Sequence, residues 1–155
     1  MLNSLTILVL KTFYVNTPFP LSEAKKTMLE EKTEQVRSQF QAGACDQLYQ
    51  DFHQETMDTE FGDFSDDFNK QTKINFAEVC GQVGDHYRQS KSIELTESTC
   101  ETTRTIFNPI GTTQCVLFFK VMLADNQVLR ENFTWLLKGK NSKILNANWS
   151  EPQVE

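Results

Sequence analysis

The stretch TQCVLFFKVML, residues 113–123, decides the fold class of this chain. Its odd-numbered positions from Cys115 onward are all apolar, while Gln114 and Lys120 point to the other side. This alternation is the period of a β-strand with one buried face. Further strands are predicted at 92–97, 101–107, 128–138 and 143–149. Turn sequences join them at 108–111, 124–127 and 139–142, which predicts an antiparallel meander of at least four strands.

Upstream of these strands, apolar residues recur every three to four positions, which predicts helices. Three helices are expected, at 23–41, at 46–57 and from 66 to the glycines at 81 and 84. Ser22 and Ser65 are suited to cap the first and third helices, and Gly43 ends the first. Three helices packed on one face of a curved antiparallel sheet make an α+β domain.

Length and composition indicate a single domain. The chain has 155 residues, 39% of them hydrophobic and 23% charged, with a net charge of −6. The negative charge argues against nucleic-acid binding, and charged residues interrupt every apolar run before it could span a membrane. We expect the domain to cover 22–149, with a tail at 150–155.

The first 21 residues form a separate N-terminal segment with an apolar run from Leu5 to Leu10. One interpretation is the remnant of a signal peptide, and the other is an apolar arm or edge strand. A signal would place the protein in the periplasm or outside the cell, and its absence would leave it in the cytoplasm. The sequence leaves both interpretations open.

A family resemblance rests on four short stretches. They are FQAGACDQLY at 40–49, VLFFKV at 116–121, ENF at 131–133 and GKNSKIL at 139–145. Together with the order of elements, they resemble the nuclear-transport-factor-two-like (cystatin-like) superfamily, and within it small, mostly exported bacterial domains of unknown function. The resemblance implies a cystatin-like roll with a cavity between sheet and helices. It implies no activity, because this scaffold hosts isomerases, dehydratases, transport adaptors and binding modules alike.

The chain has four cysteines, Cys45, Cys80, Cys100 and Cys115. If the second and third helices fold back on each other, Cys45 comes opposite Cys80, within the 4.4–6.8 Å that Cα atoms of a disulfide span. A hairpin turning at the Asn-Pro-Ile-Gly sequence sets Cys100 opposite Phe119, so a Cys100–Cys115 bridge needs a bulge or a register shift. The alternative is four buried free thiols. Disulfides would accompany export.

Glu131 is the most informative polar residue, because strand parity places it on an apolar face. The apolar residues of that face are Leu129, Phe133, Trp135 and Leu137. We therefore expect Glu131 to be buried, with a raised pKa or with a donor such as Tyr, His, Arg or a backbone amide. It is either an anchor or general base at a cavity mouth, or a structural carboxylate that reaches water or pairs with Arg or Lys.

Chemical motifs beyond this are absent from the sequence. No glycine-rich phosphate loop, zinc-spaced cysteine and histidine set or nucleophile elbow occurs. His53 and His86 have no histidine partner four positions on, and His86 is expected in a polar loop. We therefore expect no cofactor and no metal.

Two functions follow from this sequence. The first is a non-enzymatic binding module for a small apolar ligand or a protein. Its pocket candidates are Tyr49, Phe52, Phe76, Phe119, Glu131, Phe133 and Trp135. The alternative is an isomerase- or dehydratase-type enzyme with Glu131 as general base and Tyr49, His53 or Tyr87 as hydrogen-bond donors.

A homodimer through the sheet is a further expectation. The outer face of the 113–123 strand carries Val116, Phe118 and Met122, interrupted by Lys120. Such an apolar patch can mark an interface.

Overall fold

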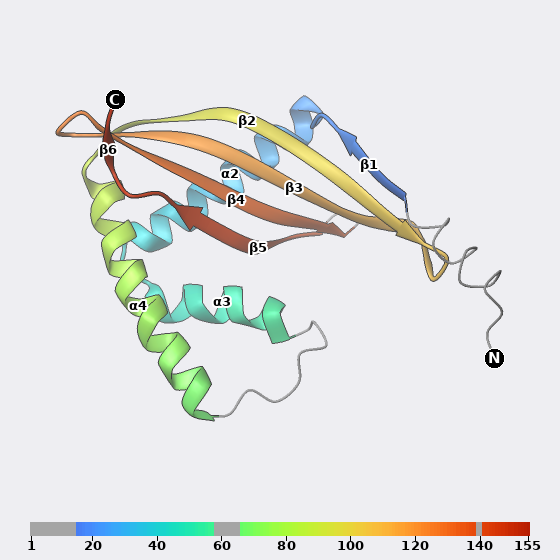
Figure 1. The fold of residues 1–155 in the computed structure, drawn as a ribbon, viewed down its shortest axis with the longest axis horizontal. Helices are drawn as coiled ribbons and strands as arrows, with labels where there is room; N and C mark the ends of the chain where they lie inside the picture. The colour runs from blue at the N-terminus through green and yellow to red at the C-terminus, as the bar shows by residue number, and fades with distance from the viewer. Residues whose placement is uncertain (1–14, 58–65, 139–140) are drawn as a thin grey trace.

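The computed structural model describes residues 15–57, 66–138 and 141–155, with side chains for all of these except 15–18, 52–57, 66–74 and 138 (Figure 1). Its elements follow in the order β1 (Val15–Phe19), α2 (Glu23–Gln41), α3 (Cys45–Met57), α4 (Asp66–Arg88), β2 (Ser90–Thr105), β3 (Asn108–Leu123), β4 (Gln127–Lys138), β5 (Asn141–Trp149) and β6 (Gln153–Val154).

The strands form one open antiparallel sheet in the order β1-β2-β3-β4-β5, and β6 pairs with β4 beyond the end of β5. The helices α2, α3 and α4 lie together on one side of the sheet in Figure 1. Buried side chains from all three helices and from β2 to β5 belong to one main core cluster. The predicted α+β class, with three helices and an antiparallel sheet, is confirmed.

The alternation along β3 is also confirmed. Its buried side chains are Cys115, Leu117, Phe119, Val121 and Leu123, and the residues between them are half-buried. Each of the leucine, valine and phenylalanine side chains among them contributes about 1.5–3 kcal/mol by leaving water. β3 is thus the central strand against which the helices pack.

The β2–β3 hairpin differs from its prediction in two ways. The two strands expected at 92–97 and 101–107 are one continuous strand, β2, and the hairpin turns at 106–107 rather than at 108–111. The register therefore pairs Cys100 with Cys115, not with Phe119.

Gly111 is the physical reason for this shift. Its φ is +88°, and a Cβ there would lie 2.8 Å from side-chain atoms of Thr102 and Arg104. The pairing of the strands is irregular between Thr103 and Thr105, opposite this glycine. The Asn-Pro-Ile-Gly sequence therefore accommodates a bulge within β3, where a proline without a donor is tolerated, and not the turn itself.

Both disulfides are formed, and no described cysteine is free. Cys45 and Cys80 join the start of α3 to α4 with a Cα–Cα distance of 5.9 Å, as predicted. Cys100 and Cys115 bridge β2 and β3 at directly paired positions, 4.1 Å apart between Cα atoms. Two crosslinks therefore hold the helical layer and the sheet separately.

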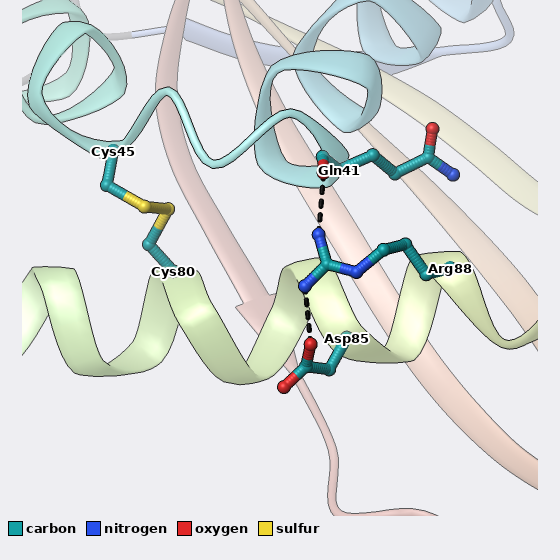
Figure 2. Close-up of a disulfide and its surroundings, with 5 residues drawn as sticks. All are labelled: Gln41, Cys45, Cys80, Asp85 and Arg88. Carbon is teal, nitrogen blue, oxygen red and sulfur yellow. Dashed lines mark hydrogen bonds and ion pairs between the residues drawn. A yellow bond between two sulfur atoms is a disulfide. The ribbon is translucent and has the colours of Figure 1, made fainter.

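Besides the Cys45–Cys80 bridge, an arginine links α4 to the end of α2 (Figure 2). The guanidinium of Arg88 donates to the backbone carbonyl of Gln41 at 2.6 Å and pairs with Asp85 one turn earlier on α4. The orphan carbonyls of a helix C-terminus need such donors. The Cys45–Cys80 bridge and Arg88 thus fix α4 against the α2–α3 connection from two points.

The prediction that Gly81 and Gly84 end the third helix is wrong, since α4 continues to Arg88 and includes His86. A glycine inside a helix costs only about 1 kcal/mol, which tertiary packing outweighs. At Gly84 the packing requires glycine, because a Cβ there would lie 2.5 Å from the carbonyl oxygen of Phe40 on α2. The two helices can cross this closely only at a residue without a side chain.

We expect Gly84→Ala to lower the free energy of unfolding by about 1–3 kcal/mol, because backbone atoms of α2 must move away. Gly81→Ala is the matched control on the same helix, since a Cβ there meets nothing within 4 Å. The control should gain up to about 1 kcal/mol from helix propensity. Urea unfolding followed by circular dichroism measures both, and equal effects at the two glycines would contradict the close crossing.

The described chain extends the sheet on both sides of 22–149. β1 pairs with β2 as an edge strand, while the apolar run 5–10 lies outside the described residues. At the other end Ser150 bonds to the backbone of Arg130, and Glu155 pairs with Lys120 and Arg130. Among the helices of the described residues, none has the length and apolar character that a membrane crossing requires.

Candidate functional site

Glu131 lies where strand parity placed it. β4 is regular along its pairing with β3, and the extra residue of the β4–β5 irregularity lies on β5. The side chain therefore points into the core, and Glu131 is 2% exposed. The prediction that this carboxylate is buried is confirmed.

Two donors hold the buried carboxylate. Arg37 on α2 donates from Nε to Oε1 of Glu131 at 2.8 Å, and its Nη2 bonds to the same oxygen. Tyr87 on α4 donates its hydroxyl to Oε2 at 2.5 Å. Both carboxylate oxygens are thus bonded, by Arg and Tyr donors of the kinds expected from the sequence.

The network continues outward from this centre. Arg37 also donates from Nη1 to the exposed Glu34 at 3.0 Å, and Trp149 on β5 donates its indole N–H to the hydroxyl of Tyr87 at 2.8 Å. The Arg37 guanidinium lies 4.2 Å from the ring centre of Phe119, a cation–π contact. The site therefore joins α2, α4, β3, β4 and β5.

Electrostatics keep these groups in their donor forms. Burial, reinforced by the adjacent charge of Glu131, raises the pKa of Tyr87 far above its usual value, so the hydroxyl keeps its proton. Burial lowers the pKa of Arg37, but the charge and hydrogen bonds of Glu131 outweigh it and leave that pKa raised. The buried carboxylate is therefore paired with a permanent cation and a neutral phenol, and the loss of either donor would leave it without full compensation.

The raised pKa of Tyr87 predicts a loss of stability in alkali. In the unfolded chain tyrosine ionises near pH 10, whereas in the folded protein Tyr87 stays protonated. Its contribution is therefore complete below about pH 10 and falls by up to about 1.4 kcal/mol per pH unit above it. Urea unfolding at several alkaline pH values should show this slope weakened in Tyr87→Phe. An identical slope in the variant would contradict the assignment.

The other predicted pocket residues divide into separate groups. Phe119 and Phe133 contact each other edge-on beside Arg37, with ring centres 6.2 Å apart. Tyr49 and Phe76 form another edge-on pair between α3 and α4, at 5.6 Å.

Trp135 bonds through its indole N–H to the hydroxyl of Thr33 on α2 at 3.1 Å. The side chains of Phe52 and His53 lie outside the described residues.

Sequence reasoning missed Arg37, the main partner of Glu131. A signal existed, because Arg37 follows Thr33 by four positions and precedes Phe40 by three, on the buried stripe of α2. A basic residue on an apolar stripe predicts a buried acidic partner. The partner itself lies 94 residues away in the chain, so only the docked helix identifies it.

Core side chains fill much of the space between sheet and helices. An open hollow of about 390 Å³ lies between α2, α3 and the strands β4 and β5, and it is lined by Val36, Trp135 and Ile144 among others. Glu131 borders a hollow of about 220 Å³ near Phe118 and Asn132. Its side chain is 0% exposed, so its residual exposure there belongs to the backbone. The carboxylate is therefore not at a cavity mouth.

A larger open cleft of about 610 Å³ lies where the second half of α4 meets the β3–β4 turn and the segment after β5. Its apolar wall consists of Val79, Val83, Leu123, Trp149 and Pro152. Trp149 belongs both to this wall and to the Glu131 network. A ligand in the cleft would thus contact the outermost member of the buried network.

Polar groups border the same cleft. The carboxylates are Asp85, Asp125 and Glu151, and the uncharged groups include Gln82, Gln89 and Gln127. His86 also lines it, and among the described residues the buried Nδ1 of His86 has no hydrogen-bond partner. The cleft therefore combines an apolar wall with an acidic, hydrogen-bonding rim.

Among the described residues, no group of three histidine, cysteine or carboxylate side chains lies close enough together to hold a metal ion. Comparisons of the chain with models of protein families, with curated proteins and with solved structures give no match.

Proposed function

We propose that this protein is a non-enzymatic binding module of the nuclear-transport-factor-two-like (cystatin-like) kind. The observation that carries the proposal is the state of Glu131, the one catalytic candidate of the sequence. Its side chain is fully buried and both its oxygens are bonded, by Arg37 and Tyr87. A general base must reach a substrate proton directly or through one water. A buried carboxylate with both oxygens bonded is a structural group, because neither oxygen is open to a substrate.

Export is part of this proposal. Two disulfides, Cys45–Cys80 and Cys100–Cys115, support an oxidising compartment such as the periplasm or the cell exterior. The three helices on an antiparallel sheet are the elements that a cystatin-like roll requires. Mass measurement of the native protein, with and without reductant, tests the redox state: four free thiols would remove the argument for export.

The ligand is assigned to the open cleft beside α4. Val79 is 42% exposed there, next to Val83 and Trp149, so an apolar group can cover it. Asp85 is paired with Arg88, so the rim offers the carboxylates of Asp125 and Glu151 to a positively charged or hydrogen-bonding group. The matching ligand is a small molecule with an apolar body and an amino group.

Dansylcadaverine, an apolar fluorophore with a primary amine, is a suitable probe. We expect it to bind the full chain, and Val79→Arg to raise its Kd by about tenfold or more, because the new side chain fills the cleft and repels the amine. Ile110→Arg is the control, since Ile110 is also apolar and exposed but lies at the far end of β3.

Dansylglycine, with a carboxylate in place of the amine, should bind more weakly than dansylcadaverine. Equal binding of both dyes, or equal affinity in the Val79→Arg and Ile110→Arg variants, would contradict the cleft as the ligand site. Dye fluorescence anisotropy gives all four titrations.

The isomerase- or dehydratase-type alternative uses the same Glu131 as base. Tyr87 lies within hydrogen-bond distance of it, as that alternative requires. Turnover of a test substrate that is lost in Glu131→Gln, at unchanged fold, would replace the binding-module proposal with this one. Pairing of two copies through the sheet stays a prediction, which light scattering at several concentrations tests.

A further inference from the structure

The β2–β3 hairpin presents apolar side chains to solvent at one end of the sheet. Phe107 is 89% exposed and Ile110 88%, and Ile106 beside them is about half as exposed. Single exposed apolar residues are common on protein surfaces. Two large apolar side chains that are almost fully exposed within four positions form a patch, and such a patch can mark a binding surface.

The tip that carries them is ordered by its own polar groups. The backbone N–H of Asn108 donates to the hydroxyl of Thr105 at 3.1 Å, and its side-chain oxygen accepts from the N–H of Gly111 at 3.2 Å. The amide of the same side chain donates to Thr112 at 3.1 Å. The apolar side chains are therefore displayed by a defined hairpin, and binding through them costs little ordering entropy.

Charge is distributed unevenly along the sheet. The β2–β3 and β4–β5 connections lie at the same end, because Thr113 near the start of β3 pairs with Leu137 near the end of β4. The sequences 101–114 and 136–143, which include these connections, contain four basic residues and one acidic residue, Glu101. The opposite end of β3 carries Asp125 in its turn.

The N-terminal residues leave the sheet at this same basic end. Val15, the first residue of β1, pairs with Arg104, two positions before Ile106. The sequence 1–14 that precedes it is mostly apolar, with Lys11 as its single charged side chain. The start of β1 and the exposed hairpin tip thus lie at one end of the sheet, beside Arg104, in a protein whose net charge is −6.

We propose that this end of the sheet docks on an anionic lipid surface, with Phe107 and Ile110 inserted at the boundary between headgroups and acyl chains. Exposed aromatic and aliphatic side chains next to basic residues are the combination that binds such interfaces. Arg104, exposed beside the tip, lies within reach of lipid phosphates. The acidic cleft beside α4 is then held away from the membrane, at the other end of β3.

Vesicle sedimentation with the full chain tests this docking. We expect binding to phosphatidylcholine vesicles that contain phosphatidylserine, weaker binding to phosphatidylcholine alone, and a decrease with added salt. Phe107→Ser combined with Ile110→Ser should reduce partitioning at least tenfold, whereas Val154→Ser should leave it unchanged. Val154 is the matched control because it is also apolar and exposed but lies in β6.

Depth of insertion gives a second readout. Phe107→Trp places a fluorophore at the tip, and brominated lipids should quench its emission if it enters the bilayer. Circular dichroism melting of every variant excludes unfolding, which is not expected for substitutions at exposed positions.

Several outcomes would overturn the proposal. Undiminished vesicle binding in the double-serine variant would assign binding to residues 1–14 alone. If the wild-type protein does not sediment with any of the vesicles, a lipid partner is excluded. Dimers that dissociate in the double-serine variant, without lipid binding, would identify a second copy as the partner of the tip.

Discussion

Arg37→Met should lower the free energy of unfolding by about 3–5 kcal/mol, the largest effect we expect from one substitution. The change leaves the Glu131 carboxylate, whose side chain is 0% exposed, without its cation. Tyr87 alone would then bond to it, and a single phenol does not offset the desolvation of a charge. Urea unfolding with intact disulfides, followed by circular dichroism, measures the loss.

Two variants make this test specific to the buried charge. Arg88→Met removes an exposed Arg that pairs with Asp85 and donates to the carbonyl of Gln41, so it should cost only about 1–2 kcal/mol. The double variant Arg37→Met/Glu131→Gln removes both charges while the glutamine still accepts from Tyr87, so it should recover most of the loss. An Arg37→Met cost equal to that of Arg88→Met would show that water reaches Glu131.

Removing the Cys45–Cys80 bridge as a double alanine variant should cost about 4 kcal/mol. The bridge closes a loop with a sequence separation of 35 residues, and the chain-entropy model scales its contribution with that length. The Cys100–Cys115 bridge has a separation of 15 and should contribute about 3 kcal/mol. Thermal and urea unfolding of both double variants give the two values.

The order of the two losses tests the model behind them. If removal of Cys100–Cys115 lowers the free energy of unfolding more than removal of Cys45–Cys80, then the packing of the buried β2–β3 bridge contributes more than chain entropy. Wild-type protein treated with reductant should match the sum of both losses, because the bridges lie in different layers of the fold. An unchanged free energy of unfolding in reductant would contradict a stabilising role for either bridge.

Local pattern in the sequence determined much of this protein. The alternation of β3, the bounds of α2 and the inward position of Glu131 all follow from a period of two or of three to four residues, which adjacent residues specify without help. The Cys45–Cys80 bridge followed from the fold-back of two neighbouring helices. These features depend on short stretches of chain, and the structure agrees with them.

Tertiary contacts decided the rest. α4 continues through Gly84, where the close approach of Phe40 on α2 requires glycine. Local helix propensity alone predicts that the helix ends at this glycine. The β2–β3 turn lies at 106–107 and not at the predicted 108–111, because Gly111 adopts the positive φ of a bulge within β3. Arg37 meets Glu131 across 94 residues, and Trp149 reaches Tyr87 across 62, only after helices and sheet have docked. Sequence patterns specify the face on which a residue lies, but its partner on another element is set by how the elements pack.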